Sequence, residues 1–121
     1  MGYKMYISKV TYLDKEKQEA DVWVSDGTHS VLCYLYPVDN QFVGQYISII
    51  ICFGCKNLQK SDCKVFQIKK LPSYYAYSVI AQVVSSQTVR VGDIIIQINE
   101  NIPADITTGD FISFDSLRFD I

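Results

Sequence analysis

The chain has 121 residues, of which 49% are hydrophobic and 20% charged, and its formal net charge is −2. This length fits one domain, and so large an apolar fraction excludes a disordered chain. The longest apolar run, ISIIICF from Ile47, is far shorter than the roughly 18 residues of a membrane-spanning helix, and the opening stretch MGYKMYISKVTYLD lacks the apolar core of a secretory signal. We therefore predict a single soluble domain over residues 1–121, located in the cytoplasm, where its cysteines would be reduced.

Apolar and polar residues alternate along most of the chain, which predicts β-strands. The first strands form a long hairpin from Tyr3 to Ser25, and Asp26-Gly27 is a favoured turn before the next strand. In the middle of the chain, Ile47, Ile49 and Ile51 are expected to share one buried face. Helical structure is expected only in the pieces KNLQKSD and PADITT, each long enough for one turn.

A short pattern occurs three times, as VGQYISIII from Val43, VGDIIIQI from Val91 and TGDFISF from Thr108. Each glycine comes just before an alternating run, where a positive φ angle or a bulge allows the chain to turn sharply into a strand. The intervals between the copies are unequal, which excludes a repeat architecture of fixed period. The pattern therefore predicts the starts of three strands and carries no chemistry of its own.

Turn signals recur about every ten residues and separate about eight or nine expected strands. Closely spaced strands without a helical period predict an all-β fold, either a single small barrel or a compact β-sandwich, with at most one or two short helical turns. The expected core consists of Ile47, Ile49, Ile51, Val79, Val83, Ile94, Ile96, Ile98 and Phe111.

The opening hairpin, the tyrosine-rich strand that ends in YP and the VGQYISI stretch resemble the first part of an oligonucleotide/oligosaccharide-binding (OB-like) barrel. The resemblance covers the first half to two-thirds of the chain. It implies a small barrel in which the helix between the third and fourth strands is reduced to KNLQKSD, and in which the strands after Tyr74 are additional.

Charges are distributed unevenly along the chain. Five lysines and one acid lie between Lys56 and Lys70, whereas six acids and one arginine lie from Val91 onward. A polarised chain with aromatic residues and no catalytic motif is typical of a protein-binding module, because aromatic side chains anchor interfaces and complementary charge guides association. We predict a non-enzymatic module that binds another protein, with a basic surface, through Asp105, Asp110, Asp115, Asp120 and Trp23. In size and charge the chain resembles bacterial toxin immunity proteins, which implies that it blocks a cognate toxin or enzyme.

In the last segment, TGDFISFDSLRFDI, strict alternation would place Asp115 on the same face of the strand as Phe111, which is expected to be buried. We expect a bulge between Phe114 and Leu117 that turns Asp110, Asp115 and Asp120 toward one solvent face. Such a face would suit a basic partner.

Single-stranded nucleic acid is the alternative ligand. Bases stack on exposed aromatic rings, and their phosphates need positive charge nearby. Tyr34, Tyr36, Tyr74 and Tyr75 would supply the rings, and Lys56, Lys60 and Lys64 would supply the charge. The acidic total argues against this ligand, since nucleic-acid-binding domains are usually basic on one face.

The residues that could carry metal or catalytic chemistry do not complete a known site. The motif CFGC, from Cys52 to Cys55, is one half of a zinc motif, and no helix is expected after it to support thiol redox chemistry. His29 is the only histidine and lies in the turn SDGTHS, without a recognisable nucleophile. We predict no metal, no cofactor and no catalytic residue.

Overall fold

The computed structural model describes residues 4–121, so Tyr3, the expected start of the first hairpin, lies outside the described residues. The described residues form an all-β structure, as predicted, and contain no helix that is long and apolar enough to cross a bilayer. The strands are β1 (Met5–Tyr12), β2 (Ala20–Ser25), β3 (Ser30–Leu35), β4 (Tyr46–Ile47), β5 (Ile50–Phe53), β6 (Lys56–Lys60), β7 (Gln67–Lys70), β8 (Tyr77–Ser85), β9 (Thr88–Val91), β10 (Ile94–Ile98), β11 (Phe111–Ser116) and β12 (Arg118–Asp120). The expected helical turn in KNLQKSD is wrong, because its first five residues are strand β6.

All these strands belong to one mixed sheet. Its hydrogen-bonded order is β4-β1-β2-β3-β12-β5-β10-β9-β8-β11-β6, and β7 pairs with β8 beside this path. The parallel pairs are β5 with β10 and β3 with β12, and the remaining pairs are antiparallel. Within residues 4–121 the path ends at β4 and β6, so the sheet is open rather than a closed barrel.

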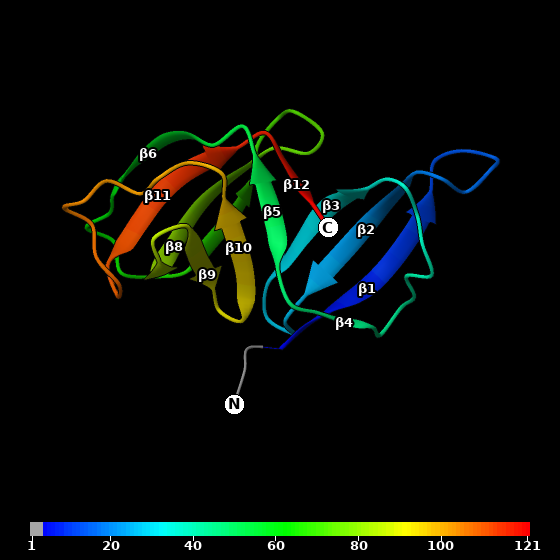
Figure 1. Ribbon diagram of the computed structural model, residues 1–121, viewed down its shortest axis with the longest axis horizontal. Helices are drawn as coiled ribbons and strands as arrows, with labels where there is room; N and C mark the ends of the chain where they lie inside the picture. Colours follow the sequence, from blue (N-terminus) through cyan, green and yellow to red (C-terminus); the bar gives the residue numbers. More distant parts are fainter. Residues whose placement is uncertain (1–3) are drawn as a thin grey trace.

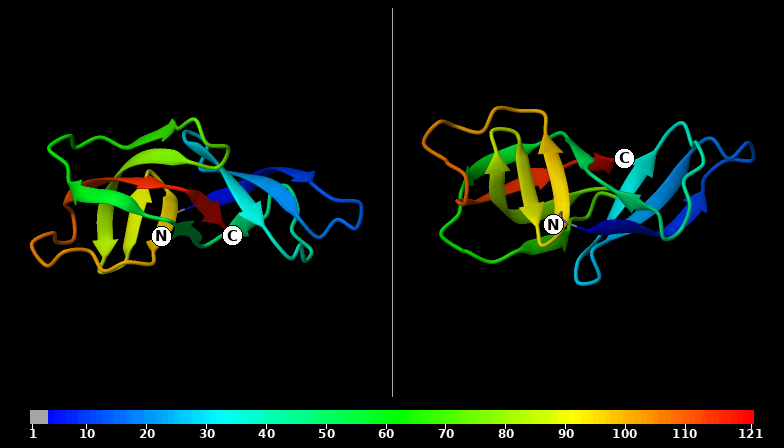
Figure 2. Two further views of the ribbon diagram at one scale, coloured as in Figure 1. Left: turned by 90° about the horizontal axis from the view of Figure 1, so that it is seen from above. Right: turned by 60° about the horizontal axis from the view of Figure 1, so that its bottom comes forward.

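The sheet forms two halves, which Figures 1 and 2 show side by side. The flat half contains β1 to β4, and the coiled half contains β5 to β11. Segment 111–120 joins them: its first part, β11, pairs with β8 and β6, and its last part, β12, pairs with β5 and β3. Only Leu117 separates β11 from β12. The path from β12 through β5, β10, β9 and β8 to β11 therefore begins and ends on one bent segment, which explains the curvature of the coiled half.

One hydrophobic core includes residues from both halves. Val79, Val83, Ile94, Ile96 and Ile98 are buried as expected. The expected burial of Ile47, Ile49 and Ile51 is wrong, because these side chains are only partly buried and Ile50 and Cys52 occupy the core instead. Ser48 and Ile49 separate β4 from β5 and belong to neither strand, so residues 46–53 do not form one continuous strand. This interruption reverses the alternation that the sequence suggests for one continuous strand.

The alternation of β11 is also opposite to the expected one. Ile112, Phe114 and Ser116 are buried, whereas Phe111 and Asp115 lie on the partly exposed face. Asp115 therefore needs no bulge to avoid the core, and the ladder between β11 and β8 keeps a regular register through Ser116. The register shift that β11 does show lies in its ladder with β6, between Ser113 and Asp115, and not between Phe114 and Leu117 as expected. The change of phase occurs at Leu117, which is exposed, and Phe119 is buried again in β12.

The three glycines of the repeated pattern have positive φ angles, as predicted: 93° at Gly44, 58° at Gly92 and 95° at Gly109. Gly92 carries a second constraint, because a Cβ atom there would lie 2.4 Å from Oδ2 of Asp26. The turn between β2 and β3 thus touches the turn between β9 and β10, and only glycine leaves room for that contact.

Candidate interaction surface

Three tyrosines form a cluster where the loop between β7 and β8 meets the flat half. The hydroxyls of Tyr74 and Tyr75 donate to the two carboxylate oxygens of Asp21, at 2.5 and 2.6 Å, and the hydroxyl of Tyr34 donates to Glu19. The rings meet edge to face, with centroids 5.9 Å apart for Tyr34 and Tyr75 and 4.7 Å apart for Tyr74 and Tyr75. Asp21 is only 5% exposed, so the two hydroxyls satisfy a buried carboxylate. The tyrosine cluster fastens this loop to β2 and β3.

The carboxylates keep these tyrosines protonated. The hydrogen bond to Glu19 raises the pKa of Tyr34 to about 12, and the bond to Asp21 raises the pKa of Tyr74. Burial and then the bond to Asp21 raise the pKa of Tyr75. The carboxylates place negative charge beside the hydroxyls, which is unfavourable for a nearby phosphate.

The structure brings together only part of the residues predicted for nucleic-acid binding. Tyr34, Tyr74 and Tyr75 share the tyrosine cluster, whereas Tyr36 lies in the connection from β3 to β4. Lys56 and Lys60 are exposed on β6, and Lys64 is exposed in the loop that follows.

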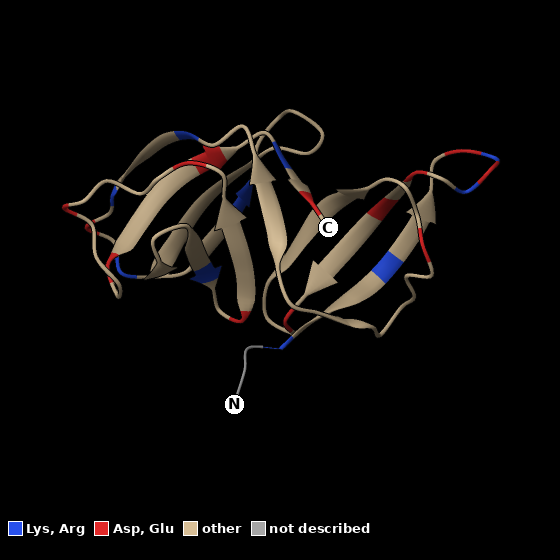
Figure 3. Cartoon of the chain, viewed as in Figure 1, with Lys and Arg blue, Asp and Glu red and all other residues tan. Residues whose placement is uncertain are grey.

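The basic and acidic segments of the sequence lie side by side in space. Strand β6, with Lys56 and Lys60, is the neighbour of β11. Nζ of Lys60 is 3.6 Å from Oδ2 of Asp110, and the amide of Asn57 donates to Asp115 at 3.1 Å. Figure 3 shows acidic and basic segments interspersed over both halves. The charge separation along the chain is therefore partly offset where these two strands pair.

The residues predicted to bind a basic partner lie on several elements. Asp110 accepts a hydrogen bond from the backbone N–H of Thr107 at 3.0 Å, which lowers the pKa of Asp110. Asp120 accepts two hydrogen bonds from Arg118, at 2.6 and 2.8 Å. Asp105 is exposed in the loop before β11, and Trp23 is partly buried against the core. Asp105 is thus the most exposed of the four predicted acids, since Asp110, Asp115 and Asp120 are partly buried.

Sequence reasoning missed the surface formed by the connection from β3 to β4 together with the first residue of β4. This apolar segment, residues 36–46, contains Tyr36, Phe42, Val43 and Tyr46, whose exposed fractions are 64%, 61%, 61% and 68%. Its backbone is fixed at both ends, because the N–H of Val38 donates to Gln18 and the N–H of Gly44 donates to Ile7. The available signal was the pair Phe42-Val43, which places two adjacent apolar residues between a polar turn and a glycine.

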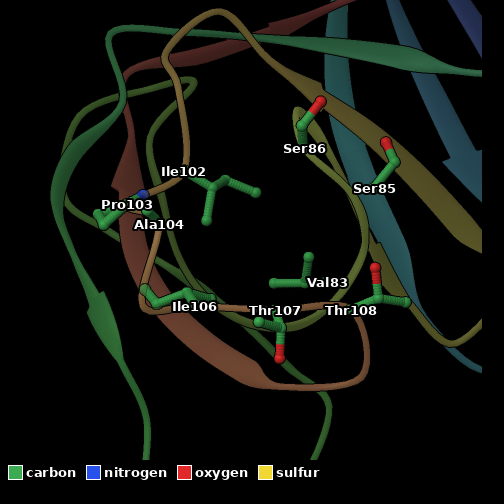
Figure 4. Close-up of a pocket in the computed structure, with 9 residues that line it drawn as sticks. All are labelled: Val83, Ser85, Ser86, Ile102, Pro103, Ala104, Ile106, Thr107 and Thr108. Atoms are coloured by element: carbon green, nitrogen blue, oxygen red, sulfur yellow. The ribbon is translucent and has the colours of Figure 1, made fainter.

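A surface pocket of about 320 Å³ lies beneath the loop that follows β10. Figure 4 shows the side chains that line it: Val83, Ser85, Ser86, Ile102, Pro103, Ala104, Ile106, Thr107 and Thr108. None of these nine residues has an ionisable side chain. The pocket thus offers hydroxyl groups and an apolar floor but no general acid or base.

Asp26 and His29 form the closest approach to a catalytic pair, with Oδ2 of Asp26 3.3 Å from Nδ1 of His29. The carboxylate also accepts hydrogen bonds from the backbone N–H groups of Thr28, His29 and Asp93, at 2.9, 2.6 and 2.9 Å. Burial alone would raise the pKa of Asp26, but these hydrogen bonds outweigh burial and lower it. Asp26 therefore holds the turn between β2 and β3 against the turn between β9 and β10.

Residues 4–121 contain no group of three or more histidine, cysteine, aspartate or glutamate side chains arranged to hold a metal ion. Comparison with protein families, with curated proteins and with solved structures gave no match to this chain.

Proposed function

We propose that this chain is a non-enzymatic protein-binding module and that the apolar segment anchors its partner. The observation that carries the proposal is the exposure of Tyr36, Phe42, Val43 and Tyr46 within one short segment. Large aromatic side chains supply much of the binding energy at protein interfaces, because they bury a large area with few rotatable bonds. Backbone hydrogen bonds hold the segment before binding, which lowers the entropic cost of association.

A partner with a basic surface suits the formal net charge of −2. Asp105 and the partly exposed Asp110, Asp115 and Asp120 would attract it over a distance and increase the rate of association. An immunity or inhibitor protein that blocks a cognate toxin or enzyme in the cytoplasm fits this description.

An OB-like barrel is part of the same proposal. Support comes from the coiled half, in which segment 111–120 contacts both ends of one turn of the sheet, as a bent strand does in a small barrel. The flat half would then be an addition to that barrel.

The apolar segment is tested with the double variant Phe42→Ser, Tyr46→Ser and the matched control Val65→Ser, Leu117→Ser, which also removes two exposed apolar side chains. A partner isolated with the wild-type chain should bind the control normally and the segment variant at least about tenfold more weakly. Normal binding by the segment variant would assign the interface to another surface.

An immunity role has its own test. A toxin gene lies beside the gene for its immunity protein, so the product of the adjacent gene should arrest growth when produced alone. Production of this chain in the same cells should restore growth. A harmless neighbouring product would remove the immunity role and leave protein binding to be judged by the segment variant.

Single-stranded nucleic acid is retained as the second candidate because Tyr74 is 62% exposed and Lys70 lies on the strand that leads into the same loop. A labelled oligonucleotide should distinguish the two candidates. Micromolar binding that weakens steeply with salt would favour nucleic acid, because released counterions drive such binding. The absence of binding at low salt would leave the protein partner.

A further inference from the structure

Cys52 and Cys55 form a pair of thiols beneath the turn that connects β5 to β6. Cys52 is in β5 and is 1% exposed, and Cys55 precedes β6 and is 8% exposed. Between them, Gly54 has a φ angle of 66°, which bends the chain sharply. The backbone N–H of Leu117 donates to the carbonyls of Phe53 and Gly54, at 3.1 and 3.3 Å, and fixes this turn.

The thiol of Cys52 donates to Oγ of Ser116 at 3.2 Å, and the Cys55 thiol lies near enough to influence the ionisation of Cys52. The neighbouring Cys55 lowers the pKa of Cys52 despite its burial, whereas Cys52 raises the pKa of Cys55. The two remaining cysteines lie outside this pair: Cys33 is buried in β3, and Cys63 is exposed in the loop after β6. Cys52 is thus the thiol that most readily becomes a thiolate within this pair.

We propose that Cys52 and Cys55 are a redox-active dithiol that closes to an intramolecular disulfide by exchange with a small-molecule disulfide. The thiolate of Cys52 attacks one sulfur of the small disulfide, and the first small thiolate leaves. The thiolate of Cys55 then attacks the sulfur of Cys52, and the second small thiolate leaves. The protein loses two protons and two electrons, and the small disulfide is reduced to two thiols.

Access to the pair requires opening of a small turn. Phe53 and Gly54, the residues between the two thiols, are both exposed, so this opening breaks the two hydrogen bonds from the N–H of Leu117 and uncovers the pair. We therefore expect the exposed Cys63 to react faster with a small disulfide and to stop at a mixed disulfide. Cys52 and Cys55 should react more slowly and proceed to the bridge, because the second thiol is only three residues away, across the bend at Gly54.

The test uses the full chain in its native state, incubated with oxidised glutathione, alkylated and digested with chymotrypsin. Cleavage after Phe53 separates Cys52 from Cys55 unless a disulfide joins the two peptides. We expect a joined pair of peptides that has lost two hydrogen atoms, about 2 Da, together with a glutathione adduct on Cys63 and unmodified Cys33. Full alkylation of both Cys52 and Cys55 when Cys63 already carries glutathione would overturn the proposal.

Two single variants provide the control. Cys55→Ser should abolish the joined peptides, whereas Cys63→Ser should leave their yield unchanged. Loss of the bridge in Cys63→Ser would show that the disulfide uses Cys63 and would also overturn the proposal. The mapping of the wild-type chain decides the question even if Cys55→Ser does not fold.

Discussion

Gly92 is the residue whose replacement has the clearest structural consequence. Its φ angle of 58° disfavours any side chain, and an added Cβ would approach Oδ2 of Asp26 to 2.4 Å. We expect Gly92→Ala to lower the free energy of unfolding by more than the roughly 1–2 kcal/mol that the left-handed backbone alone costs.

Gly109→Ala is the matched control, because Gly109 also has a positive φ angle but a Cβ there would have no atom within 4 Å. Urea denaturation of both variants measures the difference. Equal losses of stability would mean that the contact between the two turns contributes nothing.

The tyrosine cluster predicts a loss of stability in alkali. Because the pKa of Tyr34 is raised from 10 to about 12, the folded state holds this proton more tightly than the unfolded state. The resulting stabilisation is complete below about pH 10 and is lost as the pH rises through about 12.

Tyr34→Phe should therefore weaken the dependence of the free energy of unfolding on pH in this window. Urea titrations at several pH values, with ultraviolet absorbance to follow tyrosinate formation, measure it. The same slope in the variant and the wild type would show that Glu19 does not stabilise the protonated form.

At the level of single elements, β5 allows a direct test of strand phase. Ile50 is fully buried, whereas Ile51, the next residue, is partly exposed. Ile50→Ala should cost about 2–5 kcal/mol, the usual range for removing a buried aliphatic side chain, and Ile51→Ala should cost clearly less. Chemical denaturation of the two variants measures both values, and a larger effect at Ile51 would restore the phase expected from the sequence.

The sequence predicted element type better than element phase. Alternation identified most of the strands, although about eight or nine were expected and the described residues form twelve, and the glycines at 44, 92 and 109 marked where three segments turn into the sheet. The interruption at Ser48 and Ile49 contains neither glycine nor proline, so nothing in the sequence showed that the alternation restarts there. Strand β6 was missed because KNLQK is mostly polar and lies at an edge of the sheet, where few side chains need to be buried.

At the level of the whole molecule, charge shows the limit of sequence reasoning about the candidate site. Lysines and acids occupy separate parts of the chain, and this separation suggested two surfaces of opposite sign. The pairing of β6 with β11 places Lys60 beside Asp110 instead. Likewise, only the three-dimensional structure shows that Phe42 and Tyr46 are exposed.

The shared core predicts that the flat and coiled halves unfold together. Trp23, the only tryptophan, lies in β2 of the flat half, so its fluorescence reports on that half. Far-ultraviolet circular dichroism reports on strands in both halves. The two urea transitions should coincide, as two-state unfolding requires. An earlier fluorescence transition would show that the flat half opens independently.

The bent segment 111–120 also has a consequence for the protein during its synthesis. Four ladders, with β3, β5, β6 and β8, depend on this segment, and none of them can form until the ribosome has released it. A nascent chain that stops near residue 110 would expose the edges of these four strands, which is a state prone to aggregation. Productive folding of this domain must therefore wait until β12 has been synthesised, and until then the edges of the earlier strands remain unpaired.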